Sequence, residues 1–194
     1  MVSSIELFNL KGKKALITGS SQGIGYALAR GLSDAGAEIV LNGRNKEKLN
    51  NAAKSLNSSH RLYQLCFDVT DQKETKNKID NFEEEFGSID ILINNAGMQF
   101  RSPLEDFPSD MFEKLLSTNV SSIFNVGQAV AKHMIKRGYG KIINIASVQT
   151  SLARPGIAPY TATKGAVGNL TKGMATDWAK YGIQCNALAP GYFD

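Results

Sequence analysis

Short apolar runs alternate with amphipathic stretches along most of the 194-residue chain. Several of the apolar runs have no polar residue in alternate positions, which indicates central parallel strands covered on both faces. The segments between them place apolar residues three and four positions apart, as at Ile24, Ala27, Leu28 and Leu32, which predicts helices with one buried face. The candidate strands are residues 15–18, 39–42, 62–67, 91–94, 142–146 and 183–188.

This alternation of strands and helices predicts one architecture. Parallel strands joined by right-handed helical crossovers give a doubly wound α/β sheet, the Rossmann fold, with three α/β/α layers. No linker rich in Pro, Gly or Ser divides the sequence, so we expect residues 1–194 to form a single domain. The run at 183–188 would leave an unpaired edge of the sheet, which invites pairing. We therefore expect the domain to be incomplete at its C-terminus; the alternative is a short protein whose exposed edge is covered by a partner subunit.

Composition and charge narrow the class of protein. A chain with 42% hydrophobic and 21% charged residues is typical of globular domains. The net charge of +4 is spread along the sequence, and the basic stretch 132–141 is interrupted by Met134 and Ile135, which indicates a solvated helix end. We therefore expect no nucleic-acid surface. No apolar run approaches the roughly 20 residues that cross a bilayer, so no membrane segment is expected.

Cysteine and histidine are too sparse for a metal or redox site. Cys66 and Cys185 are far apart in the sequence, and His60 and His133 have no neighbouring ligand residues. The N-terminus also lacks the basic start and long apolar core of a secretory signal. We therefore expect no metal and a reducing, cytoplasmic location.

A glycine-rich turn directly follows the first predicted strand. Residues 18–25 read Thr-Gly-Ser-Ser-Gln-Gly-Ile-Gly and open the first helix. Glycines permit a tight turn and a close approach of backbone N–H groups to a pyrophosphate, which the helix N-terminus also attracts. The spacing differs from the common Gly-x-Gly-x-x-Gly fingerprint, and a similar turn can occur without a ligand. Its place between a strand and a helix favours a nucleotide site.

The end of the second strand bears on which nucleotide would bind. An NAD site usually has an acidic residue about 20 residues after the glycines, where it binds the ribose 2′-hydroxyl. Residues 42–45 read Asn-Gly-Arg-Asn and contain no acid. Arg44 offers a planar, permanently charged group that suits a 2′-phosphate, although a surface arginine at a strand end is also common. The pattern favours NADP over NAD.

A phenol and an ammonium group lie four residues apart at Tyr160 and Lys164, on one face of a predicted helix. A phenol with a pKa of about 10 is a poor acid–base group at neutral pH, and a nearby cation favours its ionised form. Chance produces this spacing often. Its weight comes from Ser147 after the fifth strand, from the Asn-Asn-Ala-Gly run at 94–97 after the fourth, and from Asn119 in a helix.

Together these motifs resemble the short-chain dehydrogenase/reductase family over residues 10–194. The resemblance implies an oxidoreductase in which Tyr160 is the acid–base group, Lys164 favours its ionised form and holds the nicotinamide ribose, and Ser147 polarises the substrate oxygen. It also implies that Asn119 holds a water molecule in a proton relay and that the protein is a homo-oligomer, a dimer or a tetramer. Relatives continue beyond residue 194 into a further strand and a substrate-covering lid, so the resemblance implies that both belong to a longer protein. The implied NADP-binding residues are Gly19, Ser21, Gln22, Gly23, Ile24, Gly25, Arg44, Asp68, Val69, Asn95, Ala96, Gly97, Tyr160, Lys164, Pro190 and Gly191.

Within that family, several stretches look most like gluconate 5-dehydrogenases, which interconvert D-gluconate and 5-keto-D-gluconate, usually with NADP. A bidentate arginine would suit the carboxylate of such a sugar acid, and Arg101 and Arg154 lie in loops after predicted strands. We expect these arginines to bind the substrate together with Ser147 and Tyr160, and we favour Arg101 slightly over Arg154. The similar stretches are residues 42–44, 98–104, 152–155, 158–160 and 191–193.

Two other functions fit the same motifs. A 3-oxoacyl-carrier-protein reductase shares every catalytic motif, but it would be expected to show a basic docking face and an apolar acyl groove. A catalytically silent nucleotide-binding protein of this fold would have no reason to keep Ser147, Tyr160 and Lys164, all of which are present.

Overall fold

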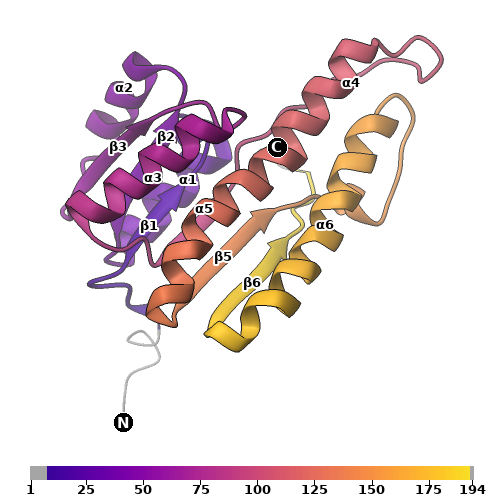
Figure 1. Ribbon diagram of the computed structural model, residues 1–194. Helices are drawn as coiled ribbons and strands as arrows, with labels where there is room; N and C mark the ends of the chain where they lie inside the picture. Colours follow the sequence, from indigo (N-terminus) through magenta and orange to yellow (C-terminus); the bar gives the residue numbers. More distant parts are fainter. Residues whose placement is uncertain (1–7, 193–194) are drawn as a thin grey trace.

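Six parallel strands form one sheet in the order β3-β2-β1-β4-β5-β6 in the computed structural model, which describes residues 8–192 (Figure 1). The strand order reverses between β1 and β4, because β2 and β3 lie on one side of β1 while β4, β5 and β6 follow on the other. The predicted doubly wound Rossmann fold is therefore confirmed. The strands are β1 (Lys14–Ile17), β2 (Glu38–Gly43), β3 (Leu62–Cys66), β4 (Ile91–Asn94), β5 (Gly140–Ile145) and β6 (Ile183–Leu188).

The predicted and observed strands differ only at their ends. β1 begins at Lys14, one residue before the apolar run, because Lys14 already pairs with Glu38 of β2, and its side chain is buried. Its ammonium donates to the backbone carbonyl of Phe86 and lies 3.8 Å from the carboxylate of Glu38. Thr18 and Phe67, which were predicted to end strands, lie just beyond β1 and β3, where the chain turns into loops.

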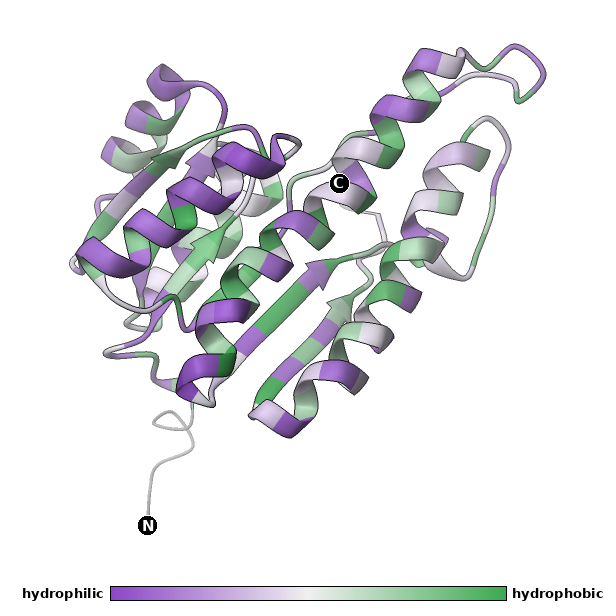
Figure 2. Ribbon diagram, in the orientation of Figure 1, coloured by the Kyte–Doolittle hydropathy of each residue, from purple (hydrophilic) through white to green (hydrophobic). Residues whose placement is uncertain are grey.

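Helices cover both faces of the sheet and bury its apolar side chains in two clusters. Ile17 of β1 packs in one cluster with Ala29 and Leu49, whereas Leu92 of β4 packs in the other with residues of α3, α5 and α6. Figure 2 shows the hydrophobic residues on the strands and the hydrophilic residues along the outer side of α3. The first cluster is covered by α1 (Gly23–Asp34) and α2 (Lys46–Leu56), and the second by α3 (Gln72–Phe86), α5 (Ser122–Arg137) and α6 (Ala158–Trp178).

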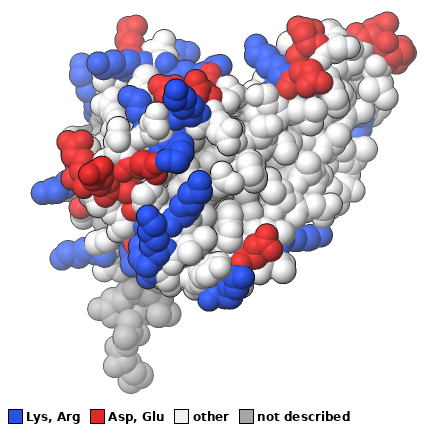
Figure 3. Space-filling view, in the orientation of Figure 1, with Lys and Arg blue, Asp and Glu red and all other residues white. Residues whose placement is uncertain are grey.

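The basic stretch 132–141 is only partly the solvated helix end that its sequence indicates. It contains the end of α5, a turn with Gly138 at a φ of 69°, and the start of β5. The guanidinium of Arg137 donates to both carboxylate oxygens of Glu83, at 3.2 and 3.1 Å, and so fastens α5 to α3. Figure 3 shows Lys and Arg interspersed with Asp and Glu on this face, without a continuous basic stripe.

Candidate active site

The turn between β1 and α1 presents backbone atoms to its surroundings. Gly19 has a φ of 63° and Gly23 a φ of 60°, a region that favours glycine. At Gly25, a Cβ atom would lie 2.5 Å from the side-chain nitrogen of Asn95 and 2.5 Å from the carbonyl oxygen of Gly19, so no larger residue fits without a shift. The first turn of α1 carries no acidic side chain. An anion such as a pyrophosphate can therefore approach this helix N-terminus.

Hydrogen bonds hold this turn against the loop that follows β4. The side-chain nitrogen of Asn95 donates to the carbonyls of Thr18, at 2.9 Å, and Gly19, at 3.2 Å. The hydroxyl of Thr18 in turn accepts from the backbone N–H groups of Asn95, at 2.9 Å, and Ala96, at 3.0 Å. These bonds cross the point at which the strand order reverses, which is where open α/β sheets bind ligands.

A cleft of about 480 Å³ opens along these loops. It brings together twelve of the predicted cofactor residues: Gly19, Ser21, Gln22, Gly23, Ile24, Gly25, Arg44, Asp68, Val69, Asn95, Ala96 and Gly97. The sequence reasoning missed further lining residues: Asn42, Gly43, Asn45, Lys48, Phe67, Thr70 and Thr118. Most of these missed residues are sequence neighbours of predicted ones at the ends of β2 and β3, so extending each motif by a few positions would have found them.

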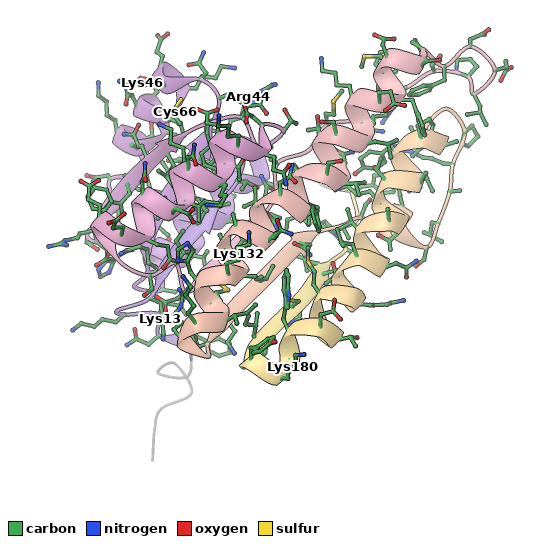
Figure 4. All side chains as sticks on the ribbon, viewed as in Figure 1. Lys13, Arg44, Lys46, Cys66, Lys132 and Lys180 are labelled. Carbon is green, nitrogen blue, oxygen red and sulfur yellow. The ribbon has the colours of Figure 1, made fainter. Side chains whose placement is uncertain are left out.

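Arg44 lies at the rim of this cleft, after β2 (Figure 4). Its side chain is 74% exposed, and its Nη1 donates to the carboxylate of Asp68 at 3.5 Å. Partial burial raises the pKa of Asp68, but hydrogen bonds from Thr70 and the charge of Arg44 outweigh this effect and hold that pKa below its usual value. An exposed guanidinium with one carboxylate partner is free to turn toward a bound phosphate.

A second cleft, of about 270 Å³, adjoins the first and shares Ile24, Asn95 and Gly97 with it. It is lined by the predicted catalytic and cofactor residues Ser147, Tyr160, Lys164, Pro190 and Gly191. Met98, Gln99, Ile145 and Ala146 complete its wall. The structure thus places the candidate serine, tyrosine and lysine together, next to the cleft of the glycine turn.

Ser147 follows β5 and caps the short helical turn Val148–Thr150. Its Oγ accepts the backbone N–H of Gln149 at 3.2 Å. A hydroxyl carries one hydrogen and two acceptor lone pairs, so this contact leaves the hydrogen available to another group. Because Ser147 lines the second cleft, its hydroxyl is available to donate to a carbonyl oxygen bound there.

Tyr160 and Lys164 lie one turn apart on α6, as the spacing predicts. Lys164 is only 6% exposed, and its Nζ donates to the carbonyl of Ile145 at 2.7 Å and lies 5.7 Å from the centroid of the Tyr160 ring. Burial lowers the pKa of Lys164 to about 8. The lysine therefore carries its charge at neutral pH, beside the phenol that this charge is expected to influence.

Asn119 lies in a π-helical segment, Ser117–Ser121, which joins α4 (Ser109–Leu116) to α5, rather than in a regular α-helix. Its side chain is fully buried. The Oδ1 atom accepts from the backbone N–H of Met98 at 2.8 Å, while the Nδ2 atom donates to the carbonyl of Met98 at 2.9 Å and to the hydroxyl of Thr163 at 3.1 Å. Both amide hydrogens are thus bonded within the protein. A water molecule bound at Asn119, as the proton relay requires, would have to donate a hydrogen bond to an oxygen atom of this residue.

The two arginines expected to bind a substrate carboxylate lie on neighbouring loops. The backbone N–H of Ser102 donates to the carbonyl of Gly156 at 3.1 Å and joins the two loops. Arg101 is exposed, whereas Arg154 is half-buried, with its guanidinium 5.1 Å from the centroid of the Tyr192 ring. Among the described residues, neither arginine lines the second cleft. Tyr192, which Arg154 contacts, directly follows Gly191, and Gly191 lines that cleft.

No group of three or more His, Cys, Asp or Glu side chains within residues 8–192 could hold a metal ion. His133 is instead paired with a carboxylate, its Nε2 lying 2.7 Å from Asp80. Over the same part of the chain, no helix combines the length and the apolar character needed to cross a membrane.

The chain is similar in sequence and in structure to known dehydrogenases and reductases. The family model described as short chain dehydrogenase matches residues 13–194. Gluconate 5-dehydrogenase of Gluconobacter oxydans (strain 621H) is 58% identical over 99% of this chain and 75% of its own length. The 5-keto-D-gluconate 5-reductase of Escherichia coli (strain K12) is 43% identical over 97% of this chain and 74% of its own. A crystal structure of a gluconate 5-dehydrogenase from Burkholderia cenocepacia J2315 in complex with NADP and tartrate superposes with a TM-score of 0.96 and 55% identity, over 99% of this chain and 76% of that one.

Proposed function

The chain belongs to the short-chain dehydrogenase family, a family of oxidoreductases that act on CH–OH groups, and we propose that it interconverts D-gluconate and 5-keto-D-gluconate with NADP. The observation that carries this proposal is the union of two clefts at one edge of the sheet. Ser147, Tyr160 and Lys164 line one cleft, and the glycine turn and Arg44 line the other. The names of the Gluconobacter and Escherichia relatives supply the substrate class.

The larger cleft suits an NADP molecule. At Gly23 a Cβ atom would meet nothing within 4 Å, so the start of α1 leaves open space that a pyrophosphate can approach, while Gly25 packs tightly against Asn95 and Gly19. Arg44 would bind the 2′-phosphate at the far end of this cleft, and Asp68 and Val69 would contact the adenine. The gluconate 5-dehydrogenase from Burkholderia supports this choice, because its crystal structure contains NADP.

In this proposal, reduction of the keto group divides the work among three side chains. The nicotinamide supplies the hydride to the carbonyl carbon. Ser147 donates a hydrogen bond to the carbonyl oxygen, and Tyr160 transfers its phenolic proton to the same oxygen. The buried Lys164 ammonium stabilises the phenolate that remains. Oxidation of gluconate follows the same steps in reverse, with the phenolate taking the proton of the alcohol.

The carboxylate of the sugar acid would be bound near the mouth of the second cleft. We favour Arg154 over Arg101 here, the reverse of the order expected from the sequence, because its guanidinium contacts the ring of Tyr192, and the neighbouring Gly191 lines this cleft. Arg101 lies on the adjoining loop and remains the second candidate. The tartrate in the Burkholderia structure, itself a hydroxy acid, supports a ligand of this chemistry.

The proposal extends to further copies of the chain as partners, as a dimer or a tetramer in the cytoplasm. Phe112 on α4 and Phe124 on α5 are 38% and 45% exposed and could pack against another copy. Sedimentation of the purified protein measures the number of copies directly.

A substrate panel tests the proposed reaction. The purified protein is given NADPH or NADH together with 5-keto-D-gluconate, an acetoacetyl thioester or a neutral keto-polyol, and the loss of reduced cofactor is followed by absorbance. We expect 5-keto-D-gluconate and NADPH to be the preferred pair. A preference for the thioester would instead indicate an acyl-carrier-protein reductase, and no turnover with any pair would indicate a silent nucleotide-binding protein.

A further inference from the structure

A continuous series of hydrogen bonds runs from the loop after β4 to the backbone of the proposed catalytic tyrosine. The backbone N–H of Met98 donates to Oδ1 of Asn119 at 2.8 Å, and Nδ2 of Asn119 donates to the hydroxyl of Thr163 at 3.1 Å. The hydroxyl of Thr163 then donates to the carbonyl of Tyr160 at 2.7 Å. Asn119 and Thr163 are both 0% exposed, so each would leave a buried polar group unsatisfied if it lost its partner.

The direction of these bonds fixes the hydroxyl of Thr163. Its oxygen accepts from Asn119, so its single hydrogen goes to the carbonyl of Tyr160. A threonine that bonds the carbonyl of a preceding helical turn is common and by itself carries no function. The contact with Asn119 is different, because it joins α6 to a segment 44 residues earlier in the chain. The other contacts of the Asn119 amide are both with Met98, which sets its orientation.

We propose that Thr163 is a positioning residue for Tyr160. Held by Asn119, its hydroxyl fixes the first turn of α6 relative to the loop of Met98, which also lines the second cleft. The phenol of Tyr160 and the hydroxyl of Ser147 then meet the substrate oxygen at the same point. The π-helical segment brings Asn119 to this level, and such segments recur at functional sites. This inference rests on the proposed function, in which Tyr160 is the acid–base group.

The same helix offers a matched control at Thr171. Its hydroxyl accepts from Nδ2 of the buried Asn144 at 2.9 Å and donates to the carbonyl of Val167 at 2.7 Å. Thr171 is only 4% exposed. The chemistry is therefore the same as at Thr163, but the bonded carbonyl lies two turns away from Tyr160. Loss of either hydroxyl should destabilise the protein, but only loss of the Thr163 hydroxyl should affect catalysis.

The test compares Thr163→Val, Thr163→Ser and Thr171→Val in the full-length protein. Each variant is assayed with whichever member of the substrate panel the wild type reduces, and thermal stability and NADPH binding are measured alongside. We expect Thr163→Val to lower kcat by about 10- to 100-fold, because a misplacement on the order of 1 Å has this cost, with little change in the KM for NADPH. Thr163→Ser keeps the hydroxyl and should restore most of kcat. Thr171→Val should lower the melting temperature but leave kcat near the wild-type value.

Two results would overturn the positioning role. One is a Thr163→Val variant with wild-type kcat, which would make the hydroxyl purely structural. The other is an equal loss of kcat in Thr163→Val and Thr171→Val, which would reflect loosening of the whole helix. If the wild type reduces another member of the panel, the proposed substrate is refuted, but the positioning role of Thr163 can still be tested with the substrate that is reduced. Turnover of none of them would remove both proposals.

Discussion

Replacement of Arg44 by alanine should remove much of the proposed preference for NADPH over NADH. In the structure, the side chain of Arg44 is 74% exposed and its one described ion pair is with Asp68, at 3.5 Å. Such an exposed pair contributes about 0–1 kcal/mol, so Arg44→Ala should barely change the stability of the fold. The expected effect is therefore confined to the cofactor.

The magnitude follows from the bond that is lost. Hydrogen bonds to charged groups contribute about 1.5–3 kcal/mol, and removal of one bond to the 2′-phosphate should raise the KM for NADPH by about 10- to 150-fold. NADH has no 2′-phosphate and should keep its KM. Because the guanidinium is exposed, added salt should screen its attraction to the 2′-phosphate. The KM for NADPH of the wild type should then approach that of Arg44→Ala.

Two variants sharpen this experiment. Lys46→Ala removes the same charge two residues further along, from a side chain that does not line the cleft as far as the chain is described, and should leave both KM values unchanged (Figure 4). Gly43→Asp places a carboxylate in the cleft, where a Cβ atom would meet nothing closer than 3.5 Å, and should favour NADH further. Equal changes of KM for both cofactors in Arg44→Ala, or equal effects of Arg44→Ala and Lys46→Ala, would refute a phosphate-binding role.

Three further predictions concern the two clefts and the loops beside them. Tyr160→Phe should lower kcat by about 10²–10⁴-fold while NADPH binding, followed by fluorescence, stays near the wild-type value; near-normal turnover would contradict the acid–base role. Gly25→Ala should weaken NADPH binding and lower the melting temperature, because the new methyl group would lie 2.5 Å from the amide of Asn95; unchanged binding would mean that the turn can open without cost. Arg154→Ala should raise the KM for 5-keto-D-gluconate and leave the KM for neutral keto-polyols unchanged. A larger effect of Arg101→Ala would instead identify Arg101 as the residue that binds the carboxylate.

The cofactor cleft was predictable because each of its parts is local in the sequence. The glycine turn, Arg44 and Asp68 each lie within two residues of the end of a predicted strand. In a parallel sheet the carboxyl ends of the strands share one edge, so motifs tens of residues apart must meet there. Their exact lining partners, such as Lys48 and Thr118, depend on how the helices and loops are placed, which the apolar pattern does not specify.

Buried polar residues explain most of what the sequence did not predict. Lys14 begins β1 although a lysine is normally taken as exposed, because Glu38 and the carbonyl of Phe86 satisfy its charge. Asn119 lies in a π-helical segment that no break in the apolar pattern indicates. Its conformation is coupled to partners far away in the sequence, Met98 and Thr163, and only the folded chain brings these together.

The position of α6 shows why such residues matter for the site. This helix carries Tyr160 and Lys164, and its apolar side chains, among them Val167 and Met174, pack into the core beneath the sheet. Two buried polar pairs add to this packing: Asn144 with Thr171 ties a later turn to β5, and Asn119 with Thr163 ties the first turn to the loop after β4. Each amide must keep its partner because unsatisfied polar groups are costly in the interior, but only the second pair lies in the turn that carries Tyr160 and bears on the position of the phenol. A core of apolar residues alone would bury the same helix without fixing the phenol to within the distance that proton transfer requires.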